Sequence, residues 1–282
     1  MNLLQILILA IVQGAAELLP VSSSAHVIVA EKLMGLDPTV PEMTLLLVML
    51  HTGTMFAVIV YFWKSWRTTY FGSVQKFRAN ALRVVVATIA TGAVGLALLQ
   101  LIKHVVAGNM PGFEIENLFG NARLMAAALA AAGVLIIVSS RFPESTGNDD
   151  LSLRSAAWIG AVQGLCLPFR GFSRSGATIS TGLALGVGRR RAEEFSFALA
   201  VVLTPAVIVK EAYRLYQAQG AAMAAHAGGL MQLVGPSLIG MALSFLAGLV
   251  ALRWLSRWLE QGRWHFFGAY CLLASLVVLW VG

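Results

Sequence analysis

The chain is poor in charge and contains almost no cysteine. Of its 282 residues only 12% are charged and 58% are hydrophobic, and the mean hydropathy is +0.78. A typical water-soluble globule carries about 25% charged residues, so this composition indicates a membrane protein. The polar connections are too short to bury a core of their own, which excludes a separate soluble catalytic domain. The two cysteines, Cys166 and Cys271, cannot form a disulfide framework.

Other features that the sequence lacks narrow the class of membrane protein. The alternating pattern of outer-membrane β-strands is missing. Met1 to Ala10 carries no Lys or Arg ahead of its apolar run, so we expect this segment to be mature protein rather than a cleaved signal. The net charge of +7 does not predict nucleic-acid binding, because the basic residues flank apolar runs instead of forming one patch. The expected partners are therefore membrane lipids and no nucleic acid.

Six apolar runs are each close to the roughly 20 residues that cross a bilayer as a helix. They cover residues of about 43–63, 83–106, 121–140, 195–214, 230–252 and 264–282. Most Lys and Arg residues of the connections fall on one face, which predicts that this face is cytoplasmic. Glu193 and Glu194 follow an arginine triplet on that face and are expected in a solvated turn.

Two other apolar regions are interrupted by polar residues and do not fit a full span. The first, residues 3–36, contains Gln13 and Glu17 and breaks at Pro20 and the three serines that follow. The second, residues 155–188, breaks between Pro168 and Arg174. We expect each region to form a re-entrant helical hairpin whose break lies at membrane depth.

The two halves of the chain resemble each other weakly. A shift of 150 residues aligns Val12, Gln13 and Gly14 with residues 162–164, which are again Val, Gln and Gly. One hairpin plus three spans is an odd number of crossings, so the second half would be inverted in the membrane. The predicted fold is an all-α integral membrane protein with two inverted-topology repeats. Each repeat, 1–147 and 148–282, would be a re-entrant hairpin plus three transmembrane helices, with Asn148 at the joint.

Hairpins that enter from opposite faces would bring the two polar breaks together, and each break precedes a helix. Free N–H groups at helix N-termini bind anions such as phosphate. Arg174 adds a planar donor for phosphate oxygens. An acidic residue such as Glu17 costs roughly 2.5 to 3.5 kcal/mol to insert among apolar residues, which favours a functional role. For His51 the sequence is equally compatible with a structural role and with a supporting role at the site.

These residues supply what phosphoryl transfer needs: a nucleophile, a base and donors for the nonbridging oxygens. Ser23 is the candidate nucleophile, and either Glu17 or His26 would take its proton. Activated water, with Ser23 only binding, is an equally permissible nucleophile. A secondary transporter or flippase of a lipid phosphate could use the same anion site without any chemistry.

Two motifs resemble those of the bacterial undecaprenyl-pyrophosphate phosphatases of the BacA/UppP type. Residues 13–17, QGAAE, followed by LPVSSSAH up to His26, resemble the (E/Q)xxxE motif and its downstream histidine. Residues 171–178, GFSRSGAT, resemble the PGxSRSxxT motif, except that Arg170 stands in place of the proline. The resemblance covers essentially the whole chain.

The resemblance implies hydrolysis of the C55 polyprenyl diphosphate to the monophosphate and inorganic phosphate, which recycles the lipid carrier of peptidoglycan synthesis. It also implies bacitracin resistance and a multi-pass protein of the bacterial plasma (inner) membrane with its active site facing the periplasm. A divalent cation, Mg²⁺ or Ca²⁺, is expected near Gln13 and Glu17, and a homodimer is left open. The residues carried over are the catalytic Glu17, Ser23, His26 and Arg174 and the substrate-binding Ser22, Ser24, Arg170, Gly171, Ser173, Ser175 and Thr178.

Overall fold

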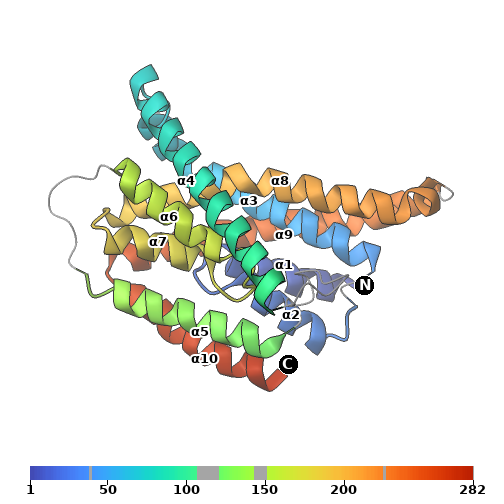
Figure 1. The fold of residues 1–282 in the computed structure, drawn as a ribbon. Helices are drawn as coiled ribbons and strands as arrows, with labels where there is room; N and C mark the ends of the chain where they lie inside the picture. Colours follow the sequence, from blue (N-terminus) through green and yellow to red (C-terminus); the bar gives the residue numbers. More distant parts are fainter. Residues whose placement is uncertain (38–39, 107–120, 143–150, 225–226, 282) are drawn as a thin grey trace.

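The computed structural model describes residues 1–37, 40–106, 121–142, 151–224 and 227–281, and all regular elements in these ranges are helices (Figure 1). This confirms the predicted all-α class. In chain order the helices are α1 (Leu3–Leu18), α2 (Ser23–Leu33), α3 (Pro41–Thr69), α4 (Val74–Leu101), the π-helix η1 (Ile102–Val106), α5 (Ala122–Ser139), α6 (Leu153–Leu165), α7 (Arg174–Ala184), α8 (Arg189–Ala224), α9 (Ala227–Glu260) and α10 (Trp264–Val281). The predicted joint at Asn148 lies outside the described residues.

Five helices within the described ranges are long and apolar enough to cross a membrane. They cover residues 43–69, 74–105, 122–139, 234–260 and 264–281, and they correspond to five of the six predicted spans. The helix that contains the second predicted span is longer than the apolar run, because Ser73 caps it and it begins at Val74. The sixth span, about 195–214, falls within α8, which is not among these five helices, and stays a prediction.

The first two helices pair with each other, as do α6 and α7, and the bends of the two pairs meet (Figure 1). Helix α1 ends at Leu18 because the next residues lead into Pro20, which cannot continue a helix. Ser175 Oγ of α7 donates to the Leu19 carbonyl at 3.2 Å, so the second pair contacts the bend of the first. The first bend, residues 19–22, is buried, and the second bend contacts it through Ser175.

Each helical pair also packs against a long helix of the other half. Helix α1 packs along α9, α6 packs along α4, and α5 pairs with α10. Gly14 of α1 lies against the Ser244 carbonyl of α9, and Gly164 of α6 lies against the Thr91 carbonyl of α4. A Cβ at either glycine would come within 2.8 Å of that oxygen, so both contacts require glycine. The two halves are thus interleaved.

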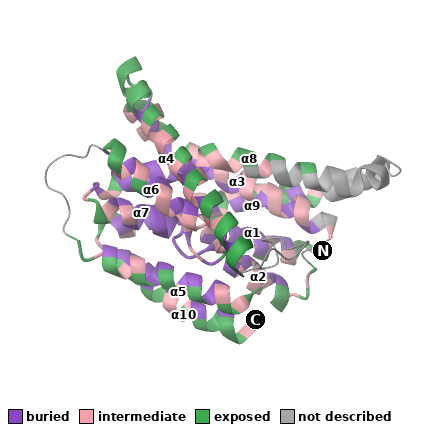
Figure 2. Ribbon diagram, viewed as in Figure 1, coloured by how far each residue is buried: buried purple, intermediate pink, exposed green. Residues whose placement is uncertain are grey.

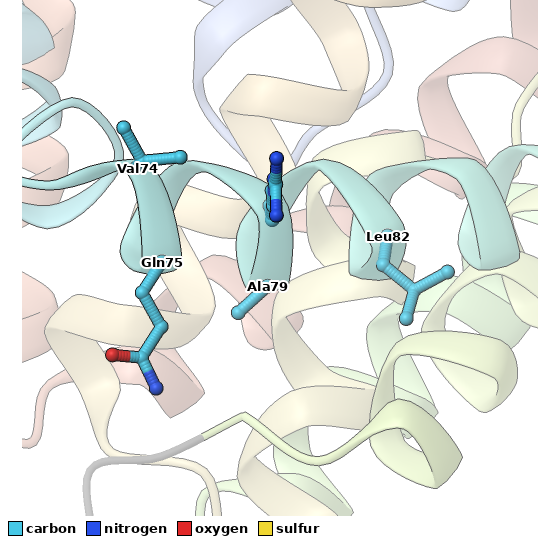
Figure 3. Close-up of a pocket in the computed structure, with 5 residues that line it drawn as sticks. Val74, Gln75, Ala79 and Leu82 are labelled. Carbon is cyan, nitrogen blue, oxygen red and sulfur yellow. The ribbon is translucent and has the colours of Figure 1, made fainter.

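Buried residues are densest in α7 and the start of α8, whereas α4 is largely exposed (Figure 2). Its exposed side chains include Ile89 and Leu96, and such apolar surface is typical of lipid contact. The outer side of the first turns of α4 carries a hollow lined by Val74, Gln75, Arg78, Ala79 and Leu82 (Figure 3). None of the predicted site residues lines this hollow.

The expectation that Glu193 and Glu194 lie in a solvated turn is wrong. They are only 2% and 4% exposed, because α8 already begins at Arg189 and packs here against α3 and α9. Ser256 of α9 donates to Glu193, and Ser65 of α3 donates to Glu194. Burial raises the pKa of Glu193 to about 8.

Candidate active site

An ion pair joins the two bends at the centre of the molecule. Arg174 Nη2 donates to Glu17 Oε1 at 3.0 Å, although the two residues are 157 positions apart. Glu17 lies in the last turn of α1 and Arg174 is the first residue of α7, so the helix ends place both charges at the bends. Their side chains are 17% and 24% exposed, and the pair neutralises two charges that would each be costly in an apolar surrounding.

The second oxygen of the Glu17 carboxylate is the centre of a polar cluster. Ser23 Oγ donates to Glu17 Oε2 at 2.6 Å, and Gln13 Nε2 donates to it at 3.3 Å. His51 Nε2 lies 3.8 Å from the same oxygen. The hydroxyl proton of Ser23 is therefore already directed at a carboxylate, which is the geometry required of a general base and its nucleophile.

The N-terminus of α2 lacks a side-chain cap. The Ser22 side chain makes no capping hydrogen bond, whereas the other Ser and Asn N-caps of the described helices each accept from a backbone N–H. The first N–H groups of a helix have no partner within the helix, so the amides at Ser23, Ser24 and Ala25 remain donors. Such a helix start binds anions, and it lies next to the Glu17 cluster through Ser23.

Arg174 has a second nitrogen without a partner. Its Nη1 is buried and has no hydrogen-bond acceptor among the described residues, while Nη2 binds Glu17. A buried donor without an acceptor is rare in folded proteins and needs a specific explanation. An oxygen of an anionic ligand would supply the missing acceptor.

The other predicted contacts of the second bend are occupied within the protein. Ser173 Oγ caps α7 by accepting from the Gly176 N–H at 3.2 Å, and Ser175 Oγ bonds to the first bend. Thr178 is fully buried, and its Oγ1 donates to the Arg174 carbonyl and lies 2.6 Å from Ser196 Oγ. Ser175 thus links the two bends, and contact of any of these hydroxyls with a substrate stays a prediction.

Near its start the second bend has an exposed residue, unlike the buried hydroxyl residues that follow it. Arg170 is exposed and interacts electrostatically with Glu31 of α2. Gly171 has φ +143°, and a Cβ there would overlap the Met125 carbonyl of α5. Glycine is therefore required at this position for the bend to approach α5. In the first bend, Ser22 is buried and Ser24 is half-buried.

His26 points to partners other than the Glu17 cluster. Its Nδ1 lies 2.8 Å from the Ser22 carbonyl oxygen, and its Nε2 lies 2.7 Å from Tyr270 Oη of α10. Both ring nitrogens are engaged, so Glu17 is better placed than His26 to receive the Ser23 proton. Sequence reasoning missed Tyr270, because an aromatic residue within an apolar span is normally a packing residue and gives no other signal.

The side chains around Glu17 offer few ligands for a cation. The described residues contain no group of three or more His, Cys, Asp or Glu side chains that could hold a metal ion. The site offers the Glu17 carboxylate and the Gln13 amide. Mg²⁺ usually binds through one or two carboxylates together with substrate phosphates and water. These residues therefore fit a cation that shares its ligands with a diphosphate, and they do not form a closed protein cage.

Comparison with protein-family models matches residues 6–277 to the family described as bacitracin resistance protein BacA. Among curated proteins, undecaprenyl-diphosphatase 2 of Acinetobacter baylyi is 66% identical over 279 residues, which cover 99% of this chain and 98% of that protein. An undecaprenyl-diphosphatase of Desulfosudis oleivorans is 32% identical over 100% of this chain and 99% of its own length. One of Rhodopirellula baltica is 31% identical over 99% of this chain and 97% of its own length.

Proposed function

The chain belongs to the BacA family of bacitracin resistance proteins, and we propose that it is an undecaprenyl-diphosphate phosphatase. It hydrolyses the C55 polyprenyl diphosphate to the monophosphate and inorganic phosphate, which returns the lipid carrier to peptidoglycan synthesis and confers bacitracin resistance. The observation that carries the proposal is the meeting of Glu17, Ser23 and Arg174 beside the uncapped start of α2. Together they supply a base, a nucleophile and donors for phosphate oxygens.

In the proposed reaction Ser23 Oγ attacks the terminal phosphorus of the diphosphate. Glu17 Oε2, 2.6 Å away, accepts the hydroxyl proton as the new O–P bond forms. The bond between the terminal phosphorus and the bridging oxygen breaks, and the lipid monophosphate leaves. The proton on Glu17 passes to the oxygen of the leaving monophosphate, so Glu17 is again a carboxylate. Water then attacks the phosphoserine while Glu17 accepts one of its protons, the bond between phosphorus and Ser23 Oγ breaks, and that proton returns to Ser23 Oγ as inorganic phosphate is released. In the alternative version, water attacks directly and Ser23 only binds.

The developing negative charge would meet fixed donors on both sides. The amides at the start of α2 and the free Nη1 of Arg174 can each bind a nonbridging oxygen. Glu17 and the Gln13 amide oxygen would hold Mg²⁺ or Ca²⁺ together with the substrate. When bound, the cation neutralises charge on the diphosphate oxygens.

The proposed membrane arrangement is two inverted-topology repeats with re-entrant hairpins α1–α2 and α6–α7. The matching contacts of α1 with α9 and of α6 with α4 support this, because an internal two-fold relation would exchange them. We place the protein in the bacterial inner membrane with its site open to the periplasm, which agrees with the basic residues of the opposite connections. The prenyl tail would stay in hydrocarbon and reach the site through a lateral opening.

Phosphate release in detergent tests the proposal. The purified protein is incubated with undecaprenyl diphosphate and Mg²⁺ or Ca²⁺, without any membrane or gradient, and inorganic phosphate is measured. Release that is lost in Arg174→Ala supports the phosphatase. A transporter or flippase would release none under these conditions, so complete absence of phosphate with either metal would contradict the proposal.

A further inference from the structure

Helix α10 contacts the serine bend through two neighbouring residues. Cys271 Sγ donates to the Pro20 carbonyl at 3.2 Å, and Tyr270 Oη lies 2.7 Å from His26 Nε2. The rings of Tyr270 and His26 stack with their centroids 5.6 Å apart and their planes 14° from parallel. A helix that belongs to neither hairpin therefore holds the bend between α1 and α2.

The Ser22 carbonyl determines which atom donates in each of the two hydrogen bonds of His26. This oxygen can only accept, so His26 Nδ1 must carry the hydrogen. In the neutral imidazole Nε2 then has a lone pair and accepts from the Tyr270 hydroxyl. The result is a chain of two hydrogen bonds from Tyr270 through His26 to the backbone of Ser22.

Ser22 is the point at which the backbone needs support. Its φ of +66° lies in the left-handed region, and it is the one non-glycine residue with positive φ in the described part of the chain. Such a conformation persists only where neighbouring groups hold it. Because the peptide is planar, fixing the Ser22 carbonyl also fixes the direction of the Ser23 N–H. The orientation of Ser22 thus controls where Ser23 meets Glu17.

We propose that Tyr270 is a positioning residue that acts through His26 to hold Ser22 and Ser23 in the geometry of phosphoryl transfer. The proposal rests on the proposed function of the same site. Without the Tyr270 hydroxyl, His26 Nε2 has no donor and the imidazole is free to turn away from the Ser22 carbonyl. Tyr270 then affects the reaction without touching the substrate.

Tyr270→Phe removes one hydroxyl group and keeps the ring. We expect kcat to fall about 3- to 10-fold while KM changes less than about twofold, because a lost hydrogen bond now misaligns the transition state rather than the bound substrate. The matched control is Tyr61→Phe, the same chemical change in α3, where the hydroxyl interacts with Ser256. This control should keep wild-type kinetics. Wild-type kinetics in Tyr270→Phe would overturn the proposal.

A double-mutant cycle with His26→Ala tests the route. If Tyr270 acts through His26, then Tyr270→Phe has less than about a twofold further effect once His26 is absent. An equal loss in both backgrounds would show that the hydroxyl acts independently of His26. A rise in KM would indicate direct contact with the lipid. Either result would refute the positioning role.

Hydrogen exchange supplies a readout that does not depend on turnover. In the full chain in detergent, peptides covering residues 19–27 should exchange their amide hydrogens faster in Tyr270→Phe than in the wild type or in Tyr61→Phe. Unchanged exchange would overturn the proposal on its own. If the wild type released no phosphate, the proposed function would fail, and the exchange result would still show whether Tyr270 holds the bend between α1 and α2.

Discussion

Replacing Glu17 by Gln removes the proposed base and leaves the side-chain volume almost unchanged. The carboxylate accepts from Ser23 at 2.6 Å and from Arg174 at 3.0 Å, so the amide loses the proton acceptor and the charge that faces the guanidinium. General-base catalysis contributes about 10²- to 10⁴-fold, and we expect kcat to fall by that factor. At a saturating concentration of Mg²⁺ or Ca²⁺ the Michaelis constant should not rise, because the neutral amide no longer repels the diphosphate and leaves Arg174 free to bind it.

The assay measures inorganic phosphate released from undecaprenyl diphosphate by purified protein in detergent, over a range of substrate concentrations. The matched control is Glu260→Gln at the exposed end of α9, which should keep wild-type kinetics. A Glu17→Gln protein with kcat within about threefold of the wild type would refute the role of Glu17 as base. A normal kcat with a strongly raised KM would instead assign Glu17 to binding.

Three further changes test separate parts of the reasoning. Ser23→Ala should leave less than about 1% of wild-type kcat if Ser23 is the nucleophile, and near wild-type turnover in the phosphate assay would exclude the covalent route. Arg174→Lys should raise KM about 10-fold or more, because an ammonium cannot bind Glu17 and phosphate through two separate nitrogens; an unchanged KM would contradict this. Glu193 has a folded-state pKa of about 8 against an ordinary value of 4.5, so the unfolded chain loses its proton first and stability should fall as pH rises from about 4.5 to about 8. Thermal unfolding of Glu193→Gln in detergent should lack that part of the pH dependence, and an identical pH profile in the two proteins would refute it.

The apolar spans and the polar residues that interrupt two of the apolar regions could be predicted from the sequence, because the bilayer fixes the length of an apolar helix. Five predicted spans have counterparts among the long helices. The early start of α4 was not readable, because hydropathy stops at the edge of the bilayer while Ser73 caps a helix that continues beyond it. The burial of Glu193 was missed for a related reason. A charged pair after arginines has the composition of a turn, and only the packing of α3 and α9 shows otherwise.

The convergence of Glu17 and Arg174 could be predicted, and so could Ser23 as a proton donor to either Glu17 or His26, whereas the choice between these two acceptors could not. Polar residues at two breaks indicate a shared site once the hairpins face each other. The choice between Glu17 and His26 depends on which way each side chain points, and no spacing in the sequence encodes that. Tyr270 lies 244 positions from His26 within an apolar run, so its hydrogen bond is visible only after the chain has folded.

The central ion pair also explains why the second bend uses arginine. Glu17 and Arg174 come from different halves, and each alone would place an unpaired charge in apolar surroundings at a cost of roughly 2.5 to 3.5 kcal/mol. Charge balance is therefore reached only when both hairpins are in place. A diphosphate then adds negative charge beside Glu17. It can bind only if a positive group interacts with it and stays paired with the carboxylate. Arg174 meets both demands, because Nη2 binds Glu17 and the buried Nη1 still has a hydrogen bond to give.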